Sequence, residues 1–164
     1  MQMKNFVNKA KGDYDYIIID CPAGLDRGFE IAVAGADRAI VVTVPELASV
    51  RDADRIAGLL EKKGISNVLL AVNKMRQSLV EIGCMLSIEE ILDTMALELV
   101  GVIPTDDAVI KAANCGIPCV CDVKSKAGRA YGNIAMRVCG EKVPLADISE
   151  KKNIFEKIAE IFKK

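Results

Sequence analysis

The stretch Tyr14–Asp26, YDYIIIDCPAGLD, decides the fold class of this chain. Within it, the apolar run Tyr16–Asp20 ends in an aspartate, and the turn-forming residues Cys-Pro-Ala-Gly follow at once. Short runs that are rich in β-branched residues and apolar on both faces are typical of strands covered by helices on both sides. We therefore predict a buried β-strand over Tyr16–Asp20, with Asp20 at its carboxyl end.

Further apolar runs alternate with helical patterns along the rest of the chain. The sequence predicts strands over Ala39–Val44, Val68–Asn73, Leu99–Pro104 and Pro118–Asp122, and helices over Leu47–Lys63, Ser87–Met95, Asp106–Asn114 and Lys126–Cys139. This alternation predicts an α/β fold with a doubly wound, mostly parallel sheet. We expect residues 1–140 to form the domain, residues 141–150 a linker, and residues 151–164 an amphipathic helix.

The composition is that of a balanced, globular chain of 164 residues with a net charge of −1. That balance gives no global field for attracting nucleic acid, so any anion binding must be local, and we expect no nucleic-acid partner. The first residues, MQMKNFVNKAKGDYD, contain no apolar signal core, and no apolar run approaches the ~20 residues of a membrane-spanning helix. We therefore expect a cytoplasmic protein with reduced cysteines.

The six cysteines admit two interpretations, because the spacing C-x3-C-x-C at 115–121 could hold a metal or cluster. However, Cys119 and Cys121 would share one face of the predicted strand, no histidine is present, and no second pair has ligand spacing. We favour roles as small, buried, apolar packing residues for these side chains.

Asp20 has a chemical interpretation beside a structural one. Ligands of open parallel sheets bind beyond the carboxyl ends of the strands, and a carboxylate there can hold Mg²⁺, usually through water, next to a nucleotide's phosphates. Pro22 and Gly24 suit a loop whose backbone approaches a phosphate and changes conformation. The alternative is a polar strand end that leads into a turn.

Several motifs favour the chemical interpretation. D-C-P-A-G resembles the D-[SC]-P-A-G motif of the MinD family, the septum site-determining ATPases of the deviant Walker group. The resemblance continues in register through VPELASVRDADRIAGLL, AVNKM, MLSIEEILDTMALELVGVIPTDDAVIKAANCGIPCV and SKAGRAYGNIAMRVCGEKVPL, and it covers residues 13–164. It implies a sheet of the P-loop NTPase type and hydrolysis of ATP with Mg²⁺.

The resemblance also implies roles for individual residues. Asp20 would be catalytic and would hold the metal through water, and the nucleotide-binding set would be Asp20, Pro22, Gly24, Glu46, Asn73, Pro104 and Asp106. An asparagine amide can pair with two atoms of an adenine edge, which suits Asn73. The structural alternatives are a strand-end turn for Asn73 and a helix N-cap for Asp106, and the second is compatible with nucleotide binding.

The helix after Glu46 is implied to be a dimer and partner interface. Its expected contact residues are Ser49, Arg51, Asp52 and Asp54. By resemblance, the partners would be a second copy of the chain, a MinC-like regulator, and a MinE- or DivIVA-type regulator. The alternative is an ordinary solvated helix face.

One part of the family's site does not occur in these residues. No glycine-rich loop with a lysine precedes Asp20, so the chain resembles the C-terminal two-thirds of the family, with an incomplete sheet. Backbone amides and a lysine supply most of the grip on phosphate. We therefore expect the 164 residues alone to be inactive, and weakly stable or prone to association, because an absent central strand leaves unpaired backbone and exposed apolar surface. A truncated gene is the plainest explanation, and a split protein is an alternative.

The last fourteen residues, KKNIFEKIAEIFKK, have a strong amphipathic pattern. On a helix, Ile154, Phe155, Ile158, Ile161 and Phe162 fall in one sector, and the segment also carries Lys151, Lys152 and Lys157. This pattern predicts a helix that binds an anionic bilayer. The segment also resembles the family's membrane-targeting helix, which implies a location at the inner face of the cell membrane. The alternative for this segment is a helix packed on the domain. For the function of the whole chain, the alternatives are a ParA-like DNA-partition ATPase or a non-catalytic fragment that binds a membrane or a partner.

Overall fold

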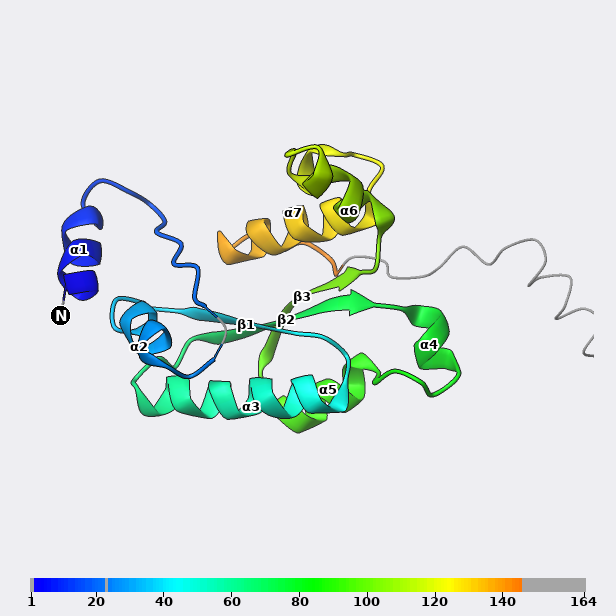
Figure 1. The fold of residues 1–164 in the computed structure, drawn as a ribbon, viewed down its shortest axis with the longest axis horizontal. Helices are drawn as coiled ribbons and strands as arrows, with labels where there is room; N and C mark the ends of the chain where they lie inside the picture. Colours follow the sequence, from blue (N-terminus) through cyan, green and yellow to red (C-terminus); the bar gives the residue numbers. More distant parts are fainter. Residues whose placement is uncertain (1, 23, 146–164) are drawn as a thin grey trace, which may run out of the picture.

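The computed structural model describes residues 2–22 and 24–145, and a parallel sheet with helices on both faces forms its centre (Figure 1). The strands are β1 (Ala39–Thr43), β2 (Val68–Met75) and β3 (Glu98–Pro104), in the order β1-β2-β3. Both pairs of neighbouring strands are parallel. The predicted α/β class and the parallel sheet are confirmed.

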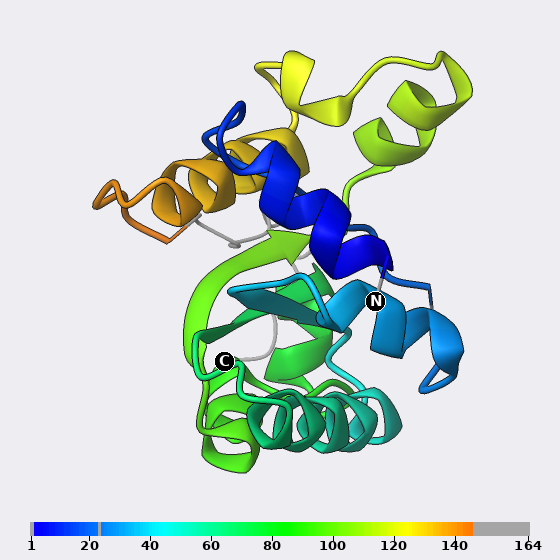
Figure 2. The ribbon, with the colours of Figure 1, turned by 90° about the vertical axis from the view of Figure 1, so that its left-hand side faces the viewer.

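The helices are α1 (Gln2–Ala10), α2 (Arg27–Val33), α3 (Leu47–Lys62), α4 (Gln77–Glu81), α5 (Ile88–Met95), α6 (Asp107–Asn114) and α7 (Lys126–Val138), with a 3₁₀ turn η1 (Cys119–Cys121). Helices α3, α5 and α7 cover the two faces of this sheet, and the other helices lie beside it or beyond its ends. Helices α3 and α5 lie on one side of the sheet and α7 on the other, as Figure 2 shows from the end of the molecule. Helices α1, α2 and α4 were not among the predicted elements.

The central strand β2 is buried on both faces, as its continuous apolar sequence predicts. Leu70 and Val72 belong to the cluster that contains Val50 of α3, whereas Ala71 belongs to the cluster that contains Ala130 of α7. The side chains of Leu70 and Val72 are fully buried. Successive residues of a strand point to opposite faces, so this arrangement places one core on each side of the sheet.

The prediction of a buried strand at Tyr16–Asp20 is wrong. The segment belongs to no strand, and the side chains of Tyr16 and Ile18 are 54% and 93% exposed. The pKa of Tyr16 is raised, first by a side-chain hydrogen bond with Cys139, the residue that follows α7. A strand is held by hydrogen bonds to a neighbour, and no described segment supplies one for this run.

The strand predicted at Pro118–Asp122 is also wrong, because these residues form the turn η1. The amide of Cys121 donates to the carbonyl of Pro118, and the amide of Asp122 donates to that of Cys119. Pro118 has no N–H for a sheet ladder. The turn packs closely on α7, where a Cβ at Gly128 would lie 2.4 Å from the Cys119 carbonyl oxygen.

Candidate functional site

The carboxyl ends of β2 and β3 point to the same edge of the sheet (Figure 1), and predicted site residues lie there. Strand β2 extends to Met75, two residues beyond the predicted end at Asn73. The ladder is irregular between Val72 and Met75, and Lys74 has a φ of 57°. Asn73 therefore lies at a kink in the strand rather than at its end.

The kink is fastened to the loop after β3. The Asn73 Oδ1 atom accepts a hydrogen bond from the Lys74 amide at 2.8 Å, which supports the unusual Lys74 backbone. Thr105 donates from its hydroxyl to the Lys74 carbonyl at 3.1 Å and from its amide to the Met75 carbonyl at 2.9 Å. Asn73 thus has the turn-forming role given as its alternative, while its amide NH₂ group remains suited to donating to the edge of a heterocycle.

Asp106 joins the first turns of two helices. Its Oδ1 accepts from the Ala108 amide at 2.9 Å, and its Oδ2 accepts from the Ser125 hydroxyl at 2.7 Å and the Ala127 amide at 3.1 Å. Burial alone would raise the pKa of Asp106, but these hydrogen bonds outweigh it and hold the pKa below its ordinary value. The expected N-cap role is confirmed, and the fold itself uses both carboxylate oxygens.

Ser125 is the partner that sequence reasoning missed. Its side chain is buried, caps α7 by accepting from the Gly128 amide at 2.8 Å, and lies 3.1 Å from the Cys119 sulfur. The available signal was a serine directly before a helical pattern, which is a common N-cap. Its pairing with Asp106, nineteen residues earlier, depends on the tertiary fold.

The helix that follows β1 presents its predicted contact residues to solvent. Glu46 occupies the N-cap position of α3 without a side-chain capping bond and is exposed. Arg51, Asp52 and Asp54 are exposed, and Ser49 is half-buried. The opposite face of α3 packs on the sheet. A charged, outward-facing surface is thus available at this helix.

The loop that contains Asp20 is placed at the start of α2. Asp26 caps α2 by accepting from the Gly28 amide at 2.8 Å, and a Cβ at Gly28 would lie 2.7 Å from the Pro22 Cγ atom. Gly24 has a φ of +100°, which favours glycine. Burial, followed by the charges of Asp20 and Asp26, raises the pKa of Cys21.

Asp20 itself is exposed. Within the described residues, no hydrogen bond or ion pair involves its side chain. The structure therefore brings Asn73, Pro104 and Asp106 together through the β2–β3 edge, but it does not join Asp20 to them.

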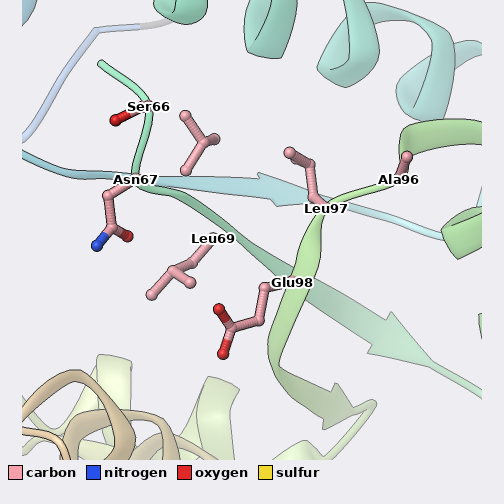
Figure 3. Close-up of a pocket in the computed structure, with 7 residues that line it drawn as sticks. Ser66, Asn67, Leu69, Ala96, Leu97 and Glu98 are labelled. Carbon is pink, nitrogen blue, oxygen red and sulfur yellow. The ribbon is translucent and has the colours of Figure 1, made fainter.

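Two surface cavities lie away from these residues. One, of about 380 Å³, is at the amino ends of β2 and β3 and is lined by residues such as Asn67 and Glu98 (Figure 3). The other, of about 480 Å³, lies between α1, α2 and the end of α3. In the described part of the chain, no group of three or more potential metal ligands gathers, and no helix is long and apolar enough to cross a membrane.

Helices on both faces of a parallel sheet, with polar loops beyond the carboxyl ends of its strands, are typical of the α/β nucleotide-binding class. Residues 1–139 match the family model ParA, described as NUBPL iron-transfer P-loop NTPase. The chain belongs to the ParA family of P-loop NTPases.

Within this family the chain is similar to MinD proteins. It is 48% identical over 163 residues to the septum site-determining protein MinD of Bacillus subtilis, a match that covers 98% of the chain and 61% of the relative. The MinD of the MinC:MinD cell division complex of Aquifex aeolicus superposes with a TM-score of 0.83 at 39% identity, covering 90% of this chain and 63% of that chain. MinD of Pyrococcus horikoshii, complexed with Mg-ADP, gives 0.74 at 31% identity, covering 84% and 55%.

These comparisons confirm the resemblance read from the motifs, including the P-loop NTPase type of fold. The chain spans about three-fifths of the length of the curated relatives it matches first. The activity and partners of the complete relatives are therefore matters for proposal.

Proposed function

We propose that this chain acts as part of a MinD-like ATPase in division-septum placement. The observation that carries the proposal is the alignment with MinD of Bacillus subtilis over 98% of the chain at 48% identity. The complete protein would hydrolyse ATP with Mg²⁺, pair with a second copy when ATP is bound, and associate with the inner face of the cell membrane from the cytoplasm.

The residues of this chain fit one side of a nucleotide site. Asn73 offers amide donors, Pro104 and the neighbouring backbone would border the base, and Glu46 would reach the nucleotide from the start of α3. Asp106 would contribute through its backbone, since both carboxylate oxygens already accept hydrogen bonds. Mg²⁺ would neutralise charge on the phosphates during attack by water.

Asp20 supplies the oxygen chemistry that Mg²⁺ prefers, and its exposure leaves the carboxylate open to a hydrated ion. Gly24 would allow the following loop to change conformation as the phosphates change, because its backbone adopts dihedral angles that other residues avoid. The 164 residues contain no lysine-bearing glycine loop, so we expect them to lack a strong grip on phosphate and to be inactive alone.

Two surfaces would serve partners. Ser49, Arg51, Asp52 and Asp54 on α3 would meet a second copy and a MinC-like regulator, which fits the structural similarity to MinD in a MinC:MinD complex. A MinE- or DivIVA-type regulator is a further candidate. Residues 151–164, which lie outside the described residues, would bind anionic lipid through their apolar sector.

The test compares phosphate release from ATP by the 164-residue chain and by a chimaera that adds the unmatched amino-terminal part of the Bacillus subtilis relative. We expect no Mg²⁺-dependent turnover by the chain and measurable turnover by the chimaera. Asp20→Ala should abolish chimaera turnover, whereas Asp15→Ala, which removes a nearby exposed carboxylate, should not. Turnover by the 164 residues would refute their inactivity, and an active Asp20→Ala chimaera would refute the role of Asp20.

A further inference from the structure

The chain does not leave α7 directly into solvent. It reverses at Gly140, whose φ is +91°, with the Glu141 amide donating to the Met136 carbonyl. Figure 1 shows the chain turning back alongside α7 (orange). The residues that follow the reversal, Val143 and Pro144, hydrogen-bond to the side of the same helix.

Arg137 makes the closest of these contacts. Its Nε and Nη2 atoms donate to the Val143 carbonyl at 3.0 and 2.9 Å, and its Nη1 atom donates to the Val100 carbonyl of β3. One turn earlier, Asn133 donates to the Pro144 carbonyl at 3.4 Å. A guanidinium presents its donors in a fixed plane, so one side chain ties the returning chain to the sheet.

The close approach of α7 to β3 makes this connection possible. A Cβ at Gly101 would lie 2.3 Å from the Ile134 Cγ1 atom, so the absence of a side chain there lets the helix sit against the strand. The Arg137 Nη1 atom would be 3.6 Å from the same position. Strand β3 pairs with β2 alone in the described sheet, so its other edge is open where Arg137 lies.

We propose that Arg137 is a positioning residue that fixes the root of residues 146–164 at the open edge of β3. With Val143 held, about nine residues separate Leu145 from Ile154, the first residue of the apolar sector, against about fourteen from Gly140. Effective concentration falls roughly as the −3/2 power of the length of a connection, so release would weaken two-copy membrane binding about twofold. The effect on membrane binding rests on the proposed function, whereas the anchoring of Val143 by Arg137 does not.

The anchoring is tested by limited trypsin digestion of the whole 164-residue chain, followed by mass spectrometry of the fragment that begins at Val143. Lys142 is exposed and directly precedes the held residue. Trypsin cleaves after Lys142 only when Val143 is released from Arg137. Hydrogen bonds from a charged donor stabilise the held state more than bonds from a neutral one, so Arg137→Gln should speed this cleavage by about tenfold. Arg137→Lys, which keeps the charge but loses the planar fork, should give an intermediate rate.

The matched control is Arg129→Gln, which removes the same charge from an exposed position of α7. Cleavage after Lys63, at the far end of α3, reports the integrity of the domain in every variant. Selective acceleration at Lys142 supports the anchor. Equal acceleration at both sites, or unchanged cleavage at Lys142, would overturn it, because Arg137 would then be a general support of the fold or no anchor at all.

The membrane step is measured separately, by co-sedimentation of wild-type and Arg137→Gln forms of the nucleotide-binding chimaera with phosphatidylglycerol vesicles. An approximately twofold loss of affinity supports the positioning role, and equal affinity of the two forms would overturn that role while leaving the digestion result intact. A wild-type chimaera that does not sediment with vesicles would count against the proposed membrane function, whatever the digestion shows.

Discussion

At the scale of single residues, Asp106 has the most connected side chain at the carboxyl edge of the sheet. It caps α6 and also accepts hydrogen bonds from Ser125 and Ala127 at the start of α7. One carboxylate therefore serves the first turns of both helices. Asp106 directly follows Thr105, whose hydroxyl and amide donate to the carbonyls of Lys74 and Met75.

Replacing Asp106 by Asn should lower the free energy of unfolding by about 1–3 kcal/mol at pH 7, because the new NH₂ group would face donors rather than accept from them. The measurement is urea unfolding followed by circular dichroism. The matched control is Asp107→Asn in the same helical turn, where the exposed carboxylate contributes only its favourable charge near the helix start, about 0.3–1 kcal/mol. Equal losses in the two variants would contradict the proposed importance of the Asp106 network.

The stabilisation by Asp106 should also depend on pH. Its pKa is lower in the folded state than in the unfolded state, so the contribution is complete above the ordinary carboxyl pKa of about 3.9 and disappears as the pH falls through the folded value. The difference in stability between wild type and Asp106→Asn should therefore shrink below about pH 4. A difference that grows in acid would contradict this assignment.

At the scale of elements, two glycines of α7 differ in the space available for a side chain. A Cβ at Gly128 would lie 2.4 Å from the Cys119 carbonyl oxygen and 3.2 Å from that of Asp122, both backbone atoms of the η1 region. At Gly132 the nearest atom would be a methyl of Val120 at 3.8 Å, which is ordinary contact. The first glycine allows helix and turn to touch, whereas the second carries no such constraint.

Gly128→Ala should destabilise the fold by about 1–3 kcal/mol despite the better helix propensity of alanine, because the turn must move away. Gly132→Ala should instead be neutral or stabilising by up to about 1 kcal/mol, since it gains propensity without a clash. Thermal unfolding of both variants measures the difference. A tolerated Gly128→Ala would show that η1 does not pack on α7 as described.

Sequence patterns predicted best those elements whose signals, such as apolar runs, turn residues and helix caps, lie within the element itself. The three observed strands are apolar on both faces and end in turn signals, and the capping box at Ser87 is present with both of its hydrogen bonds. Tyr16–Asp20 has the same local signal, but a strand also needs a neighbour, which no local pattern reveals. The Asp106–Ser125 pair was equally invisible, because its members come together only in the folded chain.

The predicted site residues differ in the same way, because some lie on strands that formed and one lies on a predicted strand that did not. Asn73, Pro104 and Asp106 lie near one sheet edge, because the carboxyl ends of parallel strands point the same way, and their nucleotide role stays a prediction. The expected position of Asp20 depended on a strand that did not form, and among the described residues no hydrogen bond or ion pair joins its side chain to the others. The nucleotide role of Asp20, like that of Glu46, stays a prediction.

At the scale of the whole molecule, the sheet has an open edge at β1. Within the described residues, strand β1 pairs only with β2, and its side chains Ile40 and Val42 are 43% and 61% exposed. The unpaired segment at Tyr16 and Ile18 adds further exposed apolar surface. Unpaired backbone beside exposed β-branched side chains favours association with other chains.

The purified chain should therefore self-associate, and Val42→Lys should reduce this by placing a charge on the edge strand. Light scattering against protein concentration measures the effect. Ile110→Lys is the matched control, since Ile110 is 65% exposed but lies on α6, away from any strand edge. If the control reduced association as strongly as Val42→Lys, general surface charge rather than the open edge would be the cause.

Vesicle co-sedimentation of the chimaera tests most directly the proposal that nucleotide-controlled pairing turns residues 151–164 into a membrane anchor. One copy of a short amphipathic segment binds weakly, and two linked copies gain roughly 10²–10⁴ in avidity. We predict that a non-hydrolysable ATP analogue with Mg²⁺ raises binding to anionic vesicles by at least about 10² over ADP, and that Phe155→Glu with Phe162→Glu abolishes it. Equal binding with both nucleotides, or binding unchanged by the glutamate substitutions, would contradict the account.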